Sequence, residues 1–543
     1  MNPKAKDTPG RARATRFSNP EQQDVLRGLL DPQCYPHEVD VVERIETHIS
    51  TVLLAGPYAY KIKKPVDLGF LDFSTLDLRR RYCEAELRLN RRLAPGLYLA
   101  VVAIVGTAQA PRIVAVDDSM ATDAIEFAVK MRRFAQSALL DRMLARGELK
   151  PHHLDALAET VAGFHAGIAR ANNSGDGTPE KISIPMRQNF SQIRPQLSAA
   201  NEIAELDVLE RWSIAEHHDL IPIMRERKRS GYVRECHGDL HLGNITWVDE
   251  GIHVFDCIEF NPALRWIDVA NEIAFTVMDL AARGRPDWAA RFLNSYLEIT
   301  GDYASLRVLP YYLVYRAMVR AKVARIRAAQ TEGEPQRAAL ADYAEHSRLA
   351  RSFTRPRQVA LIITHGVSGS GKSTATLPLV EILGALRLRS DVERKRLQGL
   401  ARNARTGAAL GAGLYSDATS LETYVELGSL AIRTIEAGYP VIVDATFLSR
   451  AQRMSFRAIA ADLDVPYVIL DFRADPAELR RRVSQRQAQG RDASEATLAV
   501  LVSQLQDDQP LDASEVDCAI TIDGQEDTSS DIVARIRVLL AAT

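Results

Sequence analysis

Cysteine is sparse in this sequence, and the few cysteines are scattered. Five occur in 543 residues, an odd number with no C-x-x-C pair among them. Disulfide frameworks and structural zinc sites both depend on paired cysteines at short spacings, so neither is expected here. The pattern is typical of a reducing compartment and predicts a cytoplasmic protein.

Long apolar runs and a strong excess of one charge are also missing. No uninterrupted apolar stretch reaches the ~20 residues that a membrane-spanning helix needs, and the N-terminus has no apolar signal core. We therefore expect no membrane partner. The formal net charge of −2 gives no general reason to bind a polyanion.

Lysine is scarce relative to arginine. The 68 basic residues comprise 12 lysines and 56 arginines. Three lysines cluster at Lys61, Lys63 and Lys64, and another is Lys372. A compact ammonium suits a phosphate site where a planar guanidinium does not fit, so these positions are candidates for phosphate contacts.

Length and pattern predict two unrelated domains. A chain of 543 residues is too long for one hydrophobic core. Residues 1–20 are interpreted as a disordered basic tail and 21–330 as the first domain. Residues 331–356 are interpreted as a linker that is partly helical, and 357–543 as the second domain. The two halves share no motif.

The first domain begins with short strands and continues mostly as helix. Ile49–Leu54 and Tyr58–Lys63 flank a Gly-Pro turn, which is typical of a β-hairpin. A helical pattern covers Leu76–Leu93, and further strands are expected at Val101–Val105 and Ala124–Met131. Helical spacing then fills residues 152–170, 188–229 and 262–350. This order predicts a small mixed lobe followed by a larger helical lobe.

A polar loop at residues 237–244 carries the first candidate site. It reads His-Gly-Asp-Leu-His-Leu-Gly-Asn and lies between apolar segments. Phosphoryl transfer to a hydroxyl needs a carboxylate that receives the proton, together with ligands for Mg²⁺. Asp239 fits the base, Asn244 offers a neutral oxygen ligand, and Asp256 fits a metal-bridging carboxylate. A loop stabilised only by Asx turns is the alternative, but the full string is more specific.

These residues resemble the aminoglycoside phosphotransferase family, a branch of the protein-kinase-like fold with a similar H-G-D-x-H-x-x-N string. The resemblance covers about residues 40–330 and implies an α+β protein-kinase-like domain. In that family a small-lobe lysine grips the nucleotide phosphates and pairs with a helix glutamate. Lys61 and Lys63 share one strand face, so either could serve, and Lys61 is favoured. Glu84 is the preferred partner, with Glu86 in reserve.

The resemblance is incomplete at several positions. No G-x-G-x-x-G precedes the lysine strand, so this is not an ordinary protein kinase. After Asp256 the sequence reads Cys-Ile-Glu-Phe, where protein kinases have Phe-Gly. Glu259 in this stretch could assist the metal or orient Asp256. Asp268 is expected to hold the loop structurally. The family includes choline, sugar and amino-alcohol kinases, and catalytic loops do not identify the acceptor.

The second candidate site is a glycine-rich loop at residues 366–374. The apolar run Val359–Ile363 precedes it and helical spacing follows, which is the context that a phosphate-binding P-loop requires. Lys372 would reach the β/γ-phosphates and Ser373 would bind Mg²⁺, while backbone N–H groups face the phosphates. The predicted nucleotide-binding residues are Gly366, Ser368, Gly369, Ser370, Gly371, Lys372, Ser373 and Thr374.

Four later residues extend this second site. Asp391 follows a candidate strand, Asp444 ends another and is suited to hold Mg²⁺, and Arg482 and Arg486 lie one helical turn apart. Residues 490–492 are expected to be a flexible end. For Asp391 a helix cap is the alternative, and for the arginines a solvated basic helix face.

The order of these residues resembles small P-loop kinases related to polynucleotide kinase and the zeta-toxin group. The resemblance covers about residues 357–543 and implies an α/β P-loop fold on a parallel sheet. It implies that Asp391 contacts or deprotonates the acceptor hydroxyl. Arg482 and Arg486 would lie on a lid over the transferring phosphate.

The whole sequence predicts a bifunctional ATP-dependent phosphotransferase. Each domain would transfer the γ-phosphoryl group of Mg·ATP to a hydroxyl of an unidentified small-molecule or nucleic-acid acceptor, with ATP and GTP both open. The alternative is an AAA-like regulatory ATPase without a dedicated acceptor, but only 171 residues (543 minus 372) follow Lys372. A nucleic-acid acceptor is not favoured, because interleaved aromatic residues are missing. The oligomeric state is open.

Overall fold

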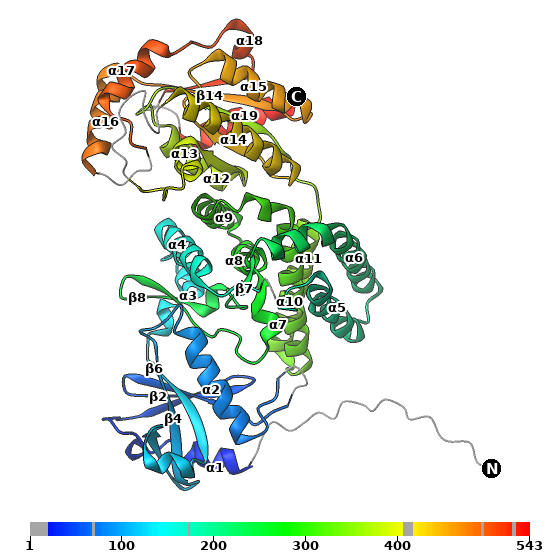
Figure 1. Ribbon diagram of the computed structural model, residues 1–543. Helices are drawn as coiled ribbons and strands as arrows, with labels where there is room; N and C mark the ends of the chain where they lie inside the picture. The colour runs from blue at the N-terminus through cyan, green and yellow to red at the C-terminus, as the bar shows by residue number, and fades with distance from the viewer. Residues whose placement is uncertain are drawn as a thin grey trace, which may run out of the picture. The chain divides into compact units, whose positions relative to one another are not determined.

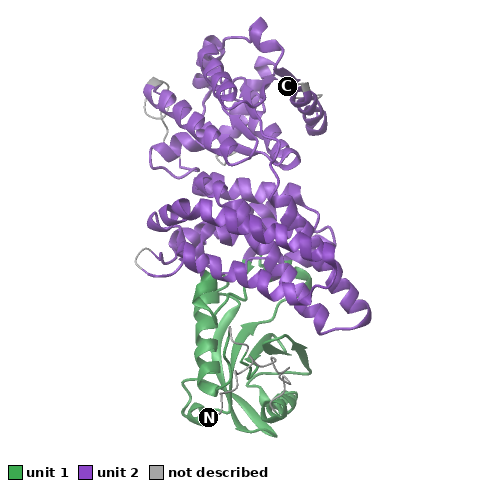
Figure 2. Ribbon diagram, turned by 90° about the vertical axis from the view of Figure 1, so that its right-hand side faces the viewer, with its two compact units in different colours: residues 1–139, 244–249, 253–265 green, residues 140–243, 250–252, 266–543 purple. Residues whose placement is uncertain are grey.

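The computed structural model describes residues 20–67, 71–171, 174–404, 416–489, 494–523 and 528–542. The expected tail, up to residue 19, and the expected flexible end at 490–492 lie outside these ranges. Two units make up the chain (Figure 2). Unit 1 contains residues 1–139, 244–249 and 253–265, and unit 2 contains residues 140–243, 250–252 and 266–543. Among the described residues, no helix is long and apolar enough to cross a membrane.

Unit 1 is built on a six-stranded antiparallel sheet in the order β1-β2-β3-β6-β4-β5. The predicted hairpin is confirmed, because β2 and β3 pair with Ala55 opposite Tyr58. The sheet strands are β1 (Val42–Glu46), β2 (Ser50–Ala55), β3 (Tyr58–Lys63), β4 (Tyr98–Thr107), β5 (Ala110–Ala115) and β6 (Glu126–Arg132). The helices are α1 (Pro20–Gly28), α2 (Leu76–Asn90) and α7 (Pro262–Arg265). A separate ribbon pairs β8 (Ile245–Val248) with β9 (Gly251–Val254).

The two faces of this sheet are covered by different helices. Tyr60 and Ile62 of β3 belong to an apolar cluster with residues of α1. Side chains alternate along a strand, so Lys61 points to the other face. On that face Val129, which is the register partner of Lys61, packs with Cys83 of α2. Helix α2 lies against the sheet (Figure 1). The alternation therefore directs Lys61 toward α2.

The first part of unit 2 is helical. Its helices are α3 (Leu140–Ala145), α4 (Pro151–Gly167), α5 (Pro179–Ile193), α6 (Ala200–Arg229), α8 (Val269–Ala282), α9 (Pro286–Thr300), α10 (Leu309–Ala329) and α11 (Gly333–Phe353). Strands β7 (Val233–Glu235) and β10 (Trp266–Asp268) pair antiparallel. Asp268 caps α8 by accepting from the Ala270 N–H at 2.8 Å, and it pairs with buried Arg227 at 2.7 Å. Asp268 thus has a structural role at the start of α8, and its expected role in holding the loop stays a prediction.

The second part of unit 2 is a five-stranded parallel sheet with helices. The strand order is β12-β13-β11-β14-β15, and each neighbouring pair is parallel. The strands are β11 (Leu361–His365), β12 (Leu386–Arg389), β13 (Val441–Asp444), β14 (Tyr467–Arg473) and β15 (Ala519–Asp523). The helices are α12 (Lys372–Leu383), α13 (Ser390–Leu397), α14 (Asp417–Glu436), α15 (Arg450–Asp462), α16 (Pro476–Gln489), α17 (Leu498–Asp507), α18 (Ala513–Val516) and α19 (Ser529–Ala542).

These elements confirm the predicted fold class, a protein-kinase-like α+β domain followed by an α/β P-loop domain. Every residue of β11 is buried, as expected for the central strand of a parallel sheet. In such sheets, ligands bind at the carboxyl ends of the strands, where the strand order changes direction. β11 lies between β13 and β14, so its carboxyl end and that of β13 meet at this position.

The residues expected to form a linker are mostly helical. Helix α11 spans most of 331–356 and packs against α10. Its buried residues are Ala339, Tyr343, Ser347 and Ala350, which recur at helical spacing along one face. The boundaries at residues 330 and 357 stay predictions.

Candidate active sites

A buried carboxylate in unit 1 joins both lysines of β3. Glu86 of α2 has no exposed surface. Its Oε1 accepts from Lys61 Nζ at 2.8 Å and its Oε2 from Lys63 Nζ at 2.6 Å. Burial alone would raise the pKa of Glu86, but the two ammonium groups lower it to about 2. The carboxylate is therefore ionised and orients both lysines.

The structure corrects the preferred partner of the lysine. Glu84 is half-exposed and pairs with Arg80 at 3.0 Å, one turn along the same helix. Residues two positions apart point in different directions on a helix, so only one of Glu84 and Glu86 can face the sheet. The reserve choice, Glu86, is the one that contacts Lys61 and Lys63.

The same lysines hold the segment that carries Asp256. Lys61 Nζ also donates to Asp256 Oδ1, and Lys63 Nζ donates to Glu259 Oε1. The Asp256 N–H donates to the Tyr98 hydroxyl at 3.1 Å, and the backbone of Asp256 has a φ of 64°. A left-handed conformation at a residue other than glycine is uncommon and is typical of functional sites. Glu259 orients this segment through Lys63.

Asn244 lies close in the fold to the Asp256 segment within unit 1. Its carbonyl accepts at 3.0 Å from the N–H of Phe255, the residue before Asp256. The Asp256 side chain is 47% exposed, so it remains accessible to a ligand. Carboxylate and amide oxygens are ligands that Mg²⁺ uses, and the two residues therefore fit their predicted metal-binding role.

In unit 2, helix α8 supports the loop that carries Asp239. Both oxygens of Glu272 accept from the loop, at 2.6 Å from the His237 N–H and 2.9 Å from the Gly238 N–H. Further along α8, Asp279 accepts from the Leu242 N–H at 2.9 Å. Neither acid was predicted, although two acids seven residues apart on an apolar helix are a recognisable signal.

Asp239 keeps its negative charge. Its Oδ2 lies 3.4 Å from His241 Nε2. Burial raises the pKa of Asp239, but the nearby rings of His241 and His237 and the guanidinium of Arg316 lower it well below its usual value. An ionised carboxylate can accept a proton, as the predicted base must.

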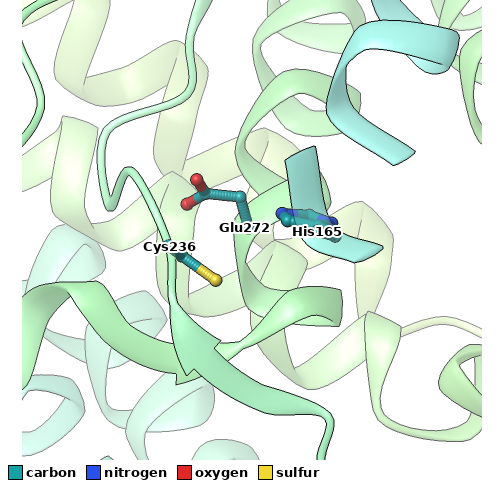
Figure 3. A group of neighbouring side chains, drawn as sticks. All are labelled: His165, Cys236 and Glu272. Atoms are coloured by element: carbon teal, nitrogen blue, oxygen red, sulfur yellow. The ribbon is translucent and has the colours of Figure 1, made fainter. Parts of the chain in front are cut away.

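Three buried side chains meet behind this loop (Figure 3). His165, Cys236 and Glu272 offer potential ligand atoms within 4.8 Å of one another. The Glu272 carboxylate already accepts two hydrogen bonds from the loop, and His165 Nδ1 lies 2.8 Å from the Tyr296 hydroxyl. Burial and the charge of Arg234 lower the pKa of His165 to about 3. We interpret the cluster as structural support for the loop.

The glycine-rich loop of unit 2 connects β11 to α12 as predicted. Gly366 has a φ of 133°, and a Cβ there would lie 2.6 Å from the Phe472 carbonyl oxygen. Lys372 is buried, and its Nζ donates to the carbonyls of Gly366 at 2.7 Å and Val367 at 2.8 Å. Burial lowers the pKa of Lys372 to about 8, against the opposing charges of Asp444 and Asp391.

A cavity of about 980 Å³ opens at the carboxyl ends of β11 and β13. It brings together the predicted residues of the second site except Gly366, namely Ser368, Gly369, Ser370, Gly371, Lys372, Ser373, Thr374, Asp391, Asp444, Arg482 and Arg486. Arg389 and Tyr424 also line it and were not predicted. Neither residue belongs to a recognised motif, so the sequence carries no clear signal for them.

Asp444 fits a metal-binding role on its own geometry. It ends β13, is buried, and its Oδ2 has no hydrogen-bond partner among the described residues. An ionisable oxygen that is buried and unsatisfied is costly unless a cation or donor occupies the space beside it. The cavity provides that space.

The two predicted lid arginines lie at the rim of the loop. Arg482 Nε donates to Glu478 at 2.5 Å, and its Nη1 lies 3.5 Å from the Gly369 carbonyl. Arg486 Nη2 contacts the Ala496 carbonyl at 3.4 Å. Asp391 is in the first turn of α13, 3.4 Å from Arg394 Nη1. All three predicted residues therefore line one cavity.

Comparison with known proteins matches each domain separately. The phosphotransferase enzyme family matches residues 73–309, and an AAA domain matches residues 361–511. Among solved structures, choline kinase from Cryptosporidium parvum Iowa II covers 61% of this chain and 96% of its own, with 10% identity and a TM-score of 0.38. A gluconokinase from Sinorhizobium meliloti 1021 covers 34% and 94%, with 20% identity and a TM-score of 0.25.

Other relatives match both domains together. An uncharacterized protein of Mycobacterium tuberculosis (strain ATCC 25618 / H37Rv) is 32% identical over 487 residues, which is 88% of this chain and 93% of that protein. An uncharacterized protein of Mycobacterium bovis has the same identity and coverage. The chain belongs to the family of these mycobacterial proteins, with an N-terminal domain of the phosphotransferase enzyme family and a C-terminal P-loop AAA domain.

Proposed function

We propose that the chain is a bifunctional ATP-dependent phosphotransferase with one site in each domain. Each site would transfer the γ-phosphoryl group of Mg·ATP to a hydroxyl of an acceptor. The observation that carries the proposal is the second-site cavity, where Lys372, Asp391 and Asp444 line one space. A nucleotide pocket alone needs no second carboxylate such as Asp391 beside the one that holds the metal.

At the P-loop site, each residue has a distinct role in this proposal. Lys372 and the loop N–H groups hold the β/γ-phosphates, and Ser373 and Asp444 hold Mg²⁺. Bound Mg·ATP supplies the phosphoryl group, with the metal neutralising its charge. Asp391 accepts the proton of the acceptor hydroxyl, while Arg482 and Arg486 cover the phosphate, as arginines in phosphoryl-transfer enzymes do.

In the phosphotransferase-family domain, the roles follow the same chemistry. Lys61, oriented by Glu86, binds the nucleotide phosphates. Asn244 and Asp256 hold Mg²⁺, and Asp239 accepts the proton of the acceptor. The lowered pKa of Asp239 keeps it ionised across the physiological pH range. Small hydroxyl compounds, among them amino alcohols and sugars, are the acceptors to be tested first.

Two isosteric variants test the proposal. Purified wild-type chain, Asp239→Asn and Asp391→Asn are each incubated with γ-labelled ATP and panels of amino alcohols, sugars and short oligonucleotides. We expect Asp239→Asn to lose one group of labelled products and Asp391→Asn to lose another, each by about 100-fold or more. Nucleotide affinity should be unchanged, because neither residue is assigned to nucleotide binding.

Other outcomes would reject specific parts of the proposal. An unchanged labelling pattern in either variant would reject the base assigned to that site. Release of labelled inorganic phosphate alone, with every acceptor tested, would favour the regulatory ATPase without a dedicated acceptor.

A further inference from the structure

A buried glutamate of helix α9 is bonded to two arginines of strand β12, within unit 2. Glu298 is 5% exposed. Its Oε2 accepts from Arg387 Nη2 at 3.2 Å and its Oε1 from Arg389 Nη1 at 3.3 Å. The Asn294 side chain on the same helix accepts from the Arg387 N–H at 2.8 Å. Helix α9 lies in the region matched by the phosphotransferase enzyme family, and β12 lies in the AAA domain.

The first arginine connects Glu298 to the phosphate loop. Arg387 Nη1 donates to the Ser373 carbonyl at 2.8 Å and lies 3.3 Å from Thr376 Oγ1. Ser373 is the residue of the loop assigned to Mg²⁺. The guanidinium of Arg387 therefore bridges Glu298 and the first turn of α12.

The second arginine connects Glu298 to the other magnesium residue. Arg389 is the register partner of Asp444 across the parallel pair β12–β13, and its Nε lies 3.9 Å from Asp444 Oδ2. Arg389 also lines the cavity. It thus lies between the Glu298 carboxylate and the Asp444 carboxylate.

The charge of Glu298 determines whether Arg389 pairs with Glu298 or with Asp444. Burial would raise the pKa of Glu298, but the guanidinium groups of Arg387 and Arg389 lower it, so it is ionised. Removing that charge leaves the guanidinium groups of Arg387 and Arg389 without their shared partner. Arg389 then has Asp444 beside it, and an arginine paired with Asp444 competes with Mg²⁺ for the same oxygen.

We propose that Glu298, a residue of the phosphotransferase-family domain, is a positioning residue for the magnesium ligands of the P-loop site. Through Arg387 it holds the backbone of Ser373. By bonding Arg389, it also keeps the guanidinium of that residue from neutralising Asp444. The P-loop site then depends on a residue that lies outside its own domain. The inference rests on the proposed function, since it requires that Mg²⁺-nucleotide binds at this site.

The test compares Glu298→Gln with a matched control, Glu381→Gln, in the full chain. Glu381 of α12 also pairs with α9, through Arg291 at 2.5 Å, but neither residue lines the cavity. Both variants carry Asp256→Asn, so that Mg²⁺-dependent binding reports the P-loop site. The measurement is fluorescent ADP binding as Mg²⁺ is titrated, alongside ADP affinity without Mg²⁺.

We expect Glu298→Gln to raise the Mg²⁺ concentration at half-maximal binding by about 10- to 100-fold, as loss of a residue that orients metal ligands commonly does. Glu381→Gln should leave it within about twofold. ADP affinity without Mg²⁺ should be similar in both. Adding Arg389→Gln to Glu298→Gln should return the Mg²⁺ requirement toward that of the parent, because the competing cation is gone.

Equal Mg²⁺ requirements in Glu298→Gln and Glu381→Gln would overturn the inference. Should Glu298→Gln fail to fold, Glu298→Asp takes its place, since a side chain one methylene shorter cannot keep the bonds to both Arg387 and Arg389. An unshifted Mg²⁺ requirement in that variant overturns the inference equally. A parent chain that binds no nucleotide in the presence of Mg²⁺ would instead reject the proposed function of this site, and the inference with it.

Discussion

The side chain of Glu86 governs how the lysines of β3 are held. Its carboxylate is bonded to both Lys61 and Lys63, and the residue has no contact with solvent. Its pKa is lowered from 4.5 to about 2, since the two ammonium groups outweigh the effect of burial. A carboxyl whose pKa is lower in the folded state than in the unfolded state stabilises the fold at every pH above the unfolded value.

The first prediction is that Glu86 contributes less to the free energy of unfolding as the pH falls. The contribution of Glu86 is fully present above about pH 4.5 and is lost as the pH falls toward about 2, and it amounts to about 3 kcal/mol. Glu86→Gln should therefore be less stable than wild type at pH 7, with a difference that shrinks as the pH falls. Hydrogen exchange of β3 and α2 peptides, corrected for intrinsic rates, measures it between pH 7 and 3.

The matched control is Glu84→Gln on the same helix. Glu84 is half-exposed and pairs only at the surface with Arg80, so its loss should cost less than about 1 kcal/mol at any pH. If the stability of wild type and of Glu86→Gln changed in parallel with pH, the role given to the shared carboxylate would be contradicted.

Helical periodicity in the sequence could have shown which of Glu84 and Glu86 lies on the buried face of α2. Cys83, Glu86 and Leu89 recur every third position of α2, and all three are buried. That spacing places Glu86 with the apolar residues and Glu84 away from them. The choice between Lys61 and Lys63 had no such signal, because alternation along a strand puts both on one face.

At the scale of elements, the junction between β11 and α12 depends on backbone conformations that favour glycine. Gly371 is the residue before α12 and has a φ of 98°. At the other end of the same helix, Gly384 has a φ of 62° and no atom within 4 Å of a Cβ built there. At both positions a side chain would strain the left-handed backbone. Only Gly371 lies in the phosphate loop.

The second prediction uses this pair. Gly371→Ala and Gly384→Ala should each lower stability by about 1–2 kcal/mol, because a Cβ disfavours the left-handed conformation. Only Gly371→Ala should also weaken ADP binding, by about tenfold or more, since the loop N–H groups that face phosphate would be displaced. Thermal unfolding and calorimetric titration measure the two effects separately. Equal ADP affinity in the two variants would count against the loop as the phosphate site.

Elements with strong local patterns were predictable from the sequence. The apolar run of β11, its glycine loop and the hairpin of β2 and β3 each have a signal within a few residues. Helix α11 was predicted only in part, because its buried stripe consists largely of small or polar residues such as Ala339 and Ser347. Apolar periodicity is weak where a helix packs closely through small side chains.

At the scale of the whole molecule, the two sites share no residue. The residues assigned to the first site all precede residue 260, and the cavity of the second is lined by residues between 368 and 532. Two sets of motifs made this division predictable. The bonds from Glu298 to Arg387 and Arg389 were not predictable, because they join residues about ninety positions apart that belong to no motif.

The last prediction is the stoichiometry of nucleotide binding. If the two sites bind independently, calorimetric titration with Mg·ADP should give two nucleotides per wild-type chain. Lys372→Ala should give one, since it removes the buried ammonium of the P-loop while leaving unit 1 unchanged. Asp256→Asn should also give one, since it removes a carboxylate assigned to Mg²⁺ in the first site.

The double variant separates independent sites from a single shared one. With independent sites, Lys372→Ala combined with Asp256→Asn should bind no Mg·ADP, and each single variant should keep the affinity of its remaining site, because distant changes add. A wild-type stoichiometry of one, lost completely in either single variant, would mean that the two sets of residues serve one nucleotide. That result would reject the bifunctional proposal, since each phosphoryl transfer requires a nucleotide of its own.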